Sequence, residues 1–125
     1  MPASIILLHH VNVTITPELE TKTKNFYANI LGLPEVPKPE ESRGRGGAWY
    51  QLGPVQLHLS IEKGVDNENA KRHFCLLVSD LDECRQRFQR AGVEIFPDDQ
   101  PIKGWLRFYV RDPGGNRIEV AEDAS

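Results

Sequence analysis

Four residues that can bind a metal recur at matching places in the two halves of this chain. His10 begins the segment His-Val-Asn-Val-Thr-Ile-Thr-Pro, and His73 begins the similar segment His-Phe-Cys-Leu-Leu-Val-Ser-Asp. His58 lies in Gln-Leu-His-Leu, and Glu119 lies at the same place in Arg-Ile-Glu-Val. Three imidazoles and one carboxylate are a donor set typical of a divalent metal. If a pseudo-twofold relates the halves, we expect these four side chains to converge on one ion.

The candidate ligands also share a face of the strands that would carry them. Side chains alternate between the two faces of a strand, so His10 lies opposite Val11, and His58 lies opposite Leu57 and Leu59. The second half repeats this division into a polar face and an apolar one. A polar inner face on a curved sheet forms a cup in which a small molecule can bind.

Elements in the same order carry the ligands in each half. The first half predicts a strand over 5–15, a helix from Thr16-Pro17 to Gly32, a weak strand near 35–36, and a hairpin over 48–61. The second half predicts a strand over 72–79, a helix over 80–91, a short strand over 93–96, and a hairpin over 105–121. We therefore expect one α+β domain over 1–125, built from two βαβββ modules. Module one covers about 5–62 and module two about 72–121. Together they are expected to form a curved, mostly antiparallel, cup-shaped sheet with the helices on its outer face.

Two motifs connect this pattern to a known family. The segment Asn-Phe-Tyr-Ala-Asn-Ile-Leu-Gly-Leu-Pro ends at Pro34, and Asp-Pro-Gly-Gly-Asn-Arg-Ile-Glu ends at Glu119. With them, the chain resembles the vicinal oxygen chelate superfamily, which includes glyoxalases, bleomycin resistance proteins and extradiol dioxygenases. The resemblance implies that His10, His73 and Glu119 are metal ligands. His58 matches a fourth position, where the glyoxalases carry a carboxylate, so it is open whether His58 binds metal, acts as a base or contacts substrate.

The resemblance implies chemistry on a small substrate that chelates a metal through two oxygens. The metal (Ni, Zn, Mn or Fe) would act as a Lewis acid and stabilise an enolate or oxyanion. Glu119 or His58 would take the proton from the adjacent carbon. This describes a glyoxalase-like lyase or isomerase. The alternatives are an extradiol-type dioxygenase or resistance thiol transferase, and a non-enzymatic protein that binds a drug or metabolite.

Other residues are predicted to contact the substrate. Four would line the cup, and two lie in a Gly-rich loop that could close over it: Asn12, Trp49, Arg107 and Tyr109, and then Arg43 and Arg45. The arginines in this set suit an anionic substrate.

Composition excludes some classes of partner. A net charge of −3 argues against nucleic-acid binding. No apolar run approaches the about 20 residues that a membrane span needs. Cys75 and Cys84 form no paired motif, so we expect reduced thiols and a cytoplasmic location. Exposed sheet edges favour a twofold homodimer, with each site built within one chain or from both chains.

Overall fold

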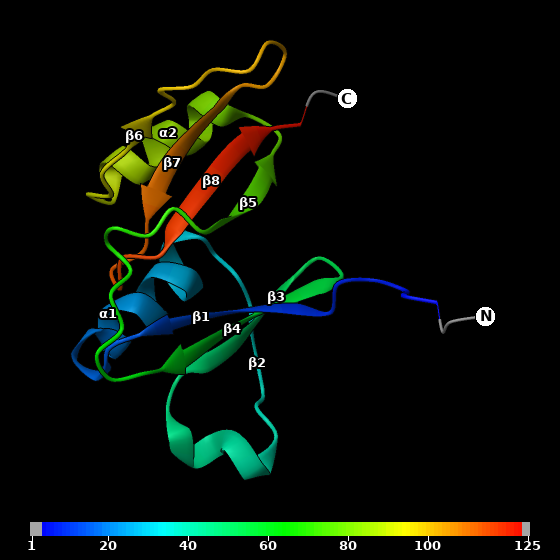
Figure 1. The fold of residues 1–125 in the computed structure, drawn as a ribbon, viewed down its shortest axis with the longest axis vertical. Helices are drawn as coiled ribbons and strands as arrows, with labels where there is room; N and C mark the ends of the chain where they lie inside the picture. The colour runs from blue at the N-terminus through cyan, green and yellow to red at the C-terminus, as the bar shows by residue number, and fades with distance from the viewer. Residues whose placement is uncertain (1–3, 124–125) are drawn as a thin grey trace.

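The computed structural model describes residues 4–123 and shows an α+β fold with two mixed four-stranded sheets, one from each module (Figure 1). Module one contains β1 (His10–Ile15), η1 (Pro17–Leu19), α1 (Glu20–Asn25), η2 (Phe26–Ile30), β2 (Glu35–Val36), η3 (Glu40–Arg45), β3 (Ala48–Leu52) and β4 (Val55–Ile61). Module two contains β5 (His73–Val78), α2 (Leu81–Arg90), β6 (Phe96–Pro97), β7 (Arg107–Arg111) and β8 (Arg117–Glu122). The predicted fold class is confirmed, and each module forms its own sheet.

The two sheets have the same strand order and the same register. Their orders are β1-β4-β3-β2 and β5-β8-β7-β6, with one parallel pair and two antiparallel pairs in each. Asn12 pairs with His58 in the first sheet, and Cys75 pairs with Glu119 in the second. His58 and Glu119 therefore occupy equivalent places, as the internal repeat predicts.

The first strand begins later than predicted. β1 starts at His10, whereas the pattern of apolar residues predicted a strand from Ile5. The preceding segment extends away from the body of the molecule (Figure 1). Its attachment to the sheet is the bond from the Gln56 N–H to the His9 carbonyl, at 2.9 Å. A strand needs a neighbour for its backbone groups, and among residues 4–123 no strand pairs with this segment.

Both helical regions cover their sheets with a few buried side chains. The first runs from Pro17 to Ile30 through 3-10, α and π turns, and it buries Phe26 and Tyr27. In module two, the Asp80 carboxylate caps α2 by accepting from the Glu83 N–H at 3.0 Å. Phe88 of α2 packs against the core of its sheet. None of the helices between residues 4 and 123 is long and apolar enough to cross a lipid bilayer.

A polar network joins the two modules. The Tyr27 hydroxyl donates to the Asp112 carboxylate at 2.7 Å, and both residues are buried. Asp112 also accepts from the Asn116 backbone N–H at 2.9 Å. The side-chain amides of Asn116 and Asn67 donate to the Thr14 carbonyl at the end of β1. These bonds fix the end of the first strand against the β7–β8 turn, and so fix one module relative to the other.

Candidate functional site

The first pair of candidate ligands lies in module one. The His58 ring on β4 is stacked between two others: the His10 ring lies 4.0 Å away and the Trp49 ring 3.9 Å away, centroid to centroid. His58 Nε2 lies 2.9 Å from Gln56 Oε1. His58 is 6% exposed. The strand register brings these side chains together, because β1 and β3 both neighbour β4.

The pKa of His58 falls to about 4. Burial is the main cause, and the neighbouring His10 and His9 add to it. The ring is therefore neutral near pH 7, and neutral imidazole is the form that binds a metal.

The second pair lies in module two and is held by neighbouring donors. His73 Nε2 lies 3.1 Å from Glu119 Oε1. Glu119 Oε2 accepts from Trp105 Nε1 at 2.8 Å, and Arg107 Nη1 lies 3.5 Å from the same oxygen. Glu119 is 5% exposed. Burial opposes its ionisation, but the bonds from Trp105, Arg107 and His73 outweigh burial and lower the pKa of Glu119 below its usual value.

The hydrogen bonds of His73 indicate which of its two ring nitrogens can bind a ligand. Nδ1 lies 2.9 Å from the Lys71 carbonyl, which can only accept, so Nδ1 carries a proton. Nε2 faces the Glu119 carboxylate, so it donates to that carboxylate when it carries a proton and offers a lone pair when it does not. An imidazole nitrogen with a lone pair beside a carboxylate oxygen is a pair of ligands that a divalent cation accepts. The donor set therefore fits a metal ion.

The Arg107 guanidinium contacts two carboxylates, those of Asp98 and Glu119, and is mostly buried. Arg107 Nε donates to Asp98 Oδ2 at 2.8 Å, and both side chains are about nine-tenths buried. A guanidinium engaged by two carboxylates is less available to an anionic substrate. Its predicted substrate contact stays a prediction, and the structure gives it a second role beside Glu119.

Tyr109 lies at the wall of a cavity, together with an arginine that the sequence did not single out. The guanidinium of Arg117 lies 3.9 Å from the centroid of the Tyr109 ring, and the ring of His73 lies edge-on to it at 5.7 Å. The cavity has a volume of about 880 Å³, and its lining includes Tyr109, Arg111, Arg117 and Phe96. His73 and Glu119 are not among the residues that line this cavity, but His73 and Arg117 together line a smaller one of about 190 Å³.

Trp105 contacts Glu119, and the sequence did not predict this contact. It precedes β7, and its hydrogen bond to Glu119 depends on the conformation of the loop before that strand. Strand alternation placed Trp105 on the same face as Arg107 and Tyr109, and this was the available signal. The alternation of side chains along a strand predicts the face on which a residue lies, but it does not predict which side chain the residue contacts.

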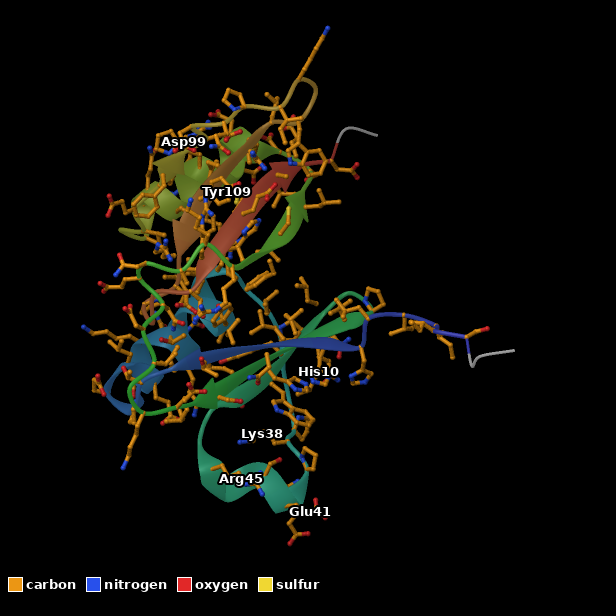
Figure 2. All side chains as sticks on the ribbon, viewed as in Figure 1. His10, Lys38, Glu41, Arg45, Asp99 and Tyr109 are labelled. Atoms are coloured by element: carbon orange, nitrogen blue, oxygen red, sulfur yellow. The ribbon has the colours of Figure 1, made fainter. Side chains whose placement is uncertain are left out.

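The remaining predicted substrate contacts lie in module one. Asn12 Oδ1 accepts from the Ser60 hydroxyl at 2.7 Å, and Asn12 is next to His58 in the register. Arg43 and Arg45 belong to η3, at the end of module one far from module two (Figure 2 labels Arg45). Arg43 Nε donates to the Lys38 carbonyl at 3.0 Å, which holds the loop together.

The two pairs of ligands do not meet within one chain. Figure 2 shows His10 on module one and Tyr109, the neighbour of His73, on module two, well separated. Across residues 4–123, no group of three or more His, Cys, Asp or Glu side chains could hold a metal ion. Each module therefore presents half of the predicted donor set.

Comparison with known proteins agrees with the fold. The chain matches the sequence profile of the Glyoxalase/Bleomycin resistance protein/Dioxygenase superfamily over residues 8–120. No curated protein sequence gives a significant match. A putative glyoxalase family protein from Bacillus anthracis is 34% identical and superposes with a TM-score of 0.88, over 98% of this chain and 99% of that one.

Two more distant structures share the fold. Lactoylglutathione lyase from Agrobacterium tumefaciens is 24% identical, with a TM-score of 0.72 over 99% of this chain and 97% of that one. The fosfomycin resistance protein FosX from Listeria monocytogenes, as an E126Q mutant complexed with Mn(II) and 1S,2S-dihydroxypropylphosphonic acid, is 18% identical. It has a TM-score of 0.80 over 95% of this chain and 93% of that one. The profile match and the Bacillus anthracis relative show that the chain belongs to the glyoxalase/bleomycin resistance protein/dioxygenase superfamily.

Proposed function

We propose that this protein is a metal-dependent lyase or isomerase of the glyoxalase type, acting on a small substrate that chelates the metal through oxygen. In this proposal the site forms between two copies, with His10 and His58 from one and His73 and Glu119 from the other. The observation that carries it is the contact between His73 Nε2 and Glu119 Oε1 at 3.1 Å, which holds an imidazole nitrogen and a carboxylate oxygen side by side.

The side chains of the two pairs suit a divalent ion. His58 is neutral at physiological pH because burial lowers its pKa, and Glu119 is ionised because its donors lower its pKa. Combining the pairs gives three nitrogen donors and one carboxylate, which suits Zn, Ni, Mn or Fe. When bound, the ion would polarise the substrate oxygens and stabilise negative charge that develops on them.

The residues around the ion have separate tasks in this proposal. Glu119 would have a second task, because an ionised carboxylate beside the substrate can take a proton from its carbon. Trp105 and Arg107 orient it by holding Oε2. Arg117 lies over the Tyr109 ring and lines the smaller cavity beside His73, where its cation suits an anionic group on the substrate.

Exposed edges and apolar side chains support assembly into a homodimer. β1 and β5 are edge strands, each paired on one side within the described chain. Leu77 on β5 is 60% exposed, and Leu7 and Leu8 before β1 are 58% and 63% exposed. Unpaired edges and exposed leucines are costly in water, and a twofold partner removes both costs.

Metal content tests the proposal directly. The purified protein, reconstituted with Ni, Zn, Mn or Fe and then dialysed, should hold about one ion per chain by elemental analysis. His73→Ala should lose the ion, whereas His9→Ala, which changes the histidine outside the donor set, should keep it. A wild-type protein that retains none of these ions would contradict the proposal, and metal-free binding of a drug or metabolite would then favour the non-enzymatic alternative.

Activity provides a second test. The loaded protein should isomerise the adduct formed between a thiol and a small 2-oxoaldehyde, and Glu119→Gln should reduce kcat far more than it raises KM. Oxygen uptake by the iron-loaded protein with a catechol would instead favour the dioxygenase alternative.

A further inference from the structure

The smaller cavity beside His73 carries positive charge and no negative charge in its lining. Its walls come from β1, from the start of β5 and from the start of β8, and Arg72 and Arg117 supply two cations. Of the described residues that line it, none is Asp or Glu. Pockets that enclose a whole drug-sized ligand measure about 300–1,000 Å³. A cavity of about 190 Å³ therefore has room for one end group of a ligand.

Both arginines keep most of their donors unused. A guanidinium has five N–H donors. Arg72 Nη2 donates to Asn67 Oδ1 at 2.7 Å, and Arg117 Nη1 donates to the Lys71 carbonyl at 3.3 Å. Within residues 4–123, these are the only hydrogen bonds of the two guanidiniums, and neither forms an ion pair with a carboxylate. Two like charges that line one cavity repel each other, and an anion between them would remove this cost.

The two arginines of β7 differ in this respect. Arg107 is engaged by two carboxylates, and Arg111 donates to three backbone carbonyls. The donors of these two side chains are used inside the protein. Arg72 and Arg117 are therefore the pair around this part of the molecule that has donors left for a ligand.

Contacts within the chain hold both guanidiniums in position. Asn67, which accepts the bond from Arg72, is 3% exposed, and its own amide donates to two backbone carbonyls at 2.7 and 2.9 Å. Arg117 lies over the Tyr109 ring, 3.9 Å from its centroid. A side chain that is already oriented loses less conformational freedom when a ligand binds.

We propose that Arg72 and Arg117 bind an oxyanion, the carboxylate or phosphate group of the substrate, in this cavity. Guanidinium donors match the paired oxygens of either group. Asn12 from β1 adds a further donor to the lining, because its Oδ1 accepts from the Ser60 hydroxyl and its Nδ2 remains available.

The inference rests on the proposed function, because His73, a ligand of the proposed metal, lines the same cavity. It deepens that function by naming the substrate class. The substrate is a small molecule that carries a carboxylate or a phosphate close to its metal-chelating oxygens.

An NMR titration of the full chain, followed at its backbone amides, tests the site. Inorganic phosphate and acetate are the two probes, and a chelator is present so that neither probe can bind through a metal. We expect saturable shifts at the amides of Arg72, His73 and Arg117 with at least one probe. The probe that binds more tightly identifies the group that the substrate carries. No saturable shift at these amides with either probe would overturn the proposal.

Variants of the two arginines measure their contribution. Arg72→Gln and Arg117→Gln should each weaken the preferred probe at least about tenfold, because each loses hydrogen bonds to a charged group. Arg117→Lys keeps the charge without the planar fork, so its affinity should lie between that of wild type and that of Arg117→Gln. Unchanged amide signals elsewhere in the spectrum verify that each variant is folded.

Arg90→Gln is the matched control. Arg90 ends α2, is exposed and does not line the cavity, so this variant should bind the probe as wild type does. Wild-type affinity in both Arg72→Gln and Arg117→Gln, or an equal loss in Arg90→Gln, would overturn the proposal.

Metal content, measured on the same proteins without the chelator, distinguishes the two proposals. A wild-type protein that holds metal but binds neither probe would overturn the oxyanion site and leave the proposed function in place. A protein that binds a probe through Arg72 and Arg117 but holds no metal would support the oxyanion site and remove the metal site.

Discussion

The hydroxyl of Tyr27 links the two modules, and its removal should destabilise the protein measurably. In Tyr27→Phe, the Asp112 carboxylate loses a 2.7 Å hydrogen bond from a fully buried donor. Burial raises the pKa of Tyr27 well above its usual value, so its hydroxyl remains a donor at any ordinary pH. A bond to a charged acceptor is worth about 1.5–3 kcal/mol. We expect a loss of about 2 kcal/mol in the free energy of unfolding, measured by urea denaturation at neutral pH.

Tyr50→Phe is the matched control. Tyr50 is equally buried, but its hydroxyl donates to the neutral Lys24 carbonyl over a longer distance, 3.4 Å. The same deletion there should cost about 0.5 kcal/mol. Equal losses from the two variants would refute the reasoning, because they would show that the charge of Asp112 adds nothing to the bond.

The loss should also depend on pH. Burial raises the pKa of Asp112, while the bonds from Tyr27 and Asn116 oppose that rise by stabilising the charged form. Without Tyr27, the pKa of Asp112 in the folded protein should be higher still. The difference between wild type and Tyr27→Phe is then fully present where Asp112 is ionised in both proteins, and it shrinks as falling pH protonates Asp112. A difference that grows toward acid pH would contradict this assignment.

Three other changes test the β7–β8 turn, the hydrogen bond to Glu119 and the effect of a bound metal on stability. An added Cβ in Gly114→Ala would lie 2.1 Å from Cγ2 of buried Ile15, so we expect a loss of about 1–3 kcal/mol in urea denaturation. Trp105→Phe removes the indole donor from Glu119, and it should weaken divalent metal binding by roughly 10–100-fold in calorimetric titrations. Finally, a bound metal at 100 times its Kd should raise the free energy of unfolding by about 2.7 kcal/mol, and chelation should reverse this.

Controls for the two substitutions come from the same chain. Gly44→Ala adds the same methyl where nothing lies within 4 Å, so its stability should match that of wild type. Trp49→Phe changes the other tryptophan, which stacks on His58 through its ring face, and phenylalanine keeps a ring there. Equal losses of metal affinity from both tryptophan variants would argue against a specific role for the Trp105 N–H.

Local pattern was enough to predict how each half of the site is built. Alternation along the strands put His10 and His58 on one face and His73 and Glu119 on another, and the register of both sheets agrees. This works because a strand fixes the face of every side chain from its position alone. The family motifs gave the same fold class, and the structural comparisons confirm it.

Other features depend on contacts that no local pattern contains. The start of β1 differs from the prediction because Ile5–Leu8 have the composition of a strand but pair with no strand in the part of the chain that the structure describes. The bond from Trp105 to Glu119 depends on the loop that precedes β7. The distance between the two pairs depends on how the modules pack, which is set by the network around Asp112.

Metal content in a mixture of two variants tests most directly whether the two pairs meet across chains. His10→Ala damages module one, and His73→Ala damages module two. In a cross-chain dimer of the two variants, one site carries both changes and the other carries neither. Co-expressed in equal amounts with random pairing, the variants should hold about one quarter of the wild-type metal content, while each variant alone holds almost none. A mixture that holds no more metal than the separate variants, from a wild-type protein that binds metal, would contradict the account.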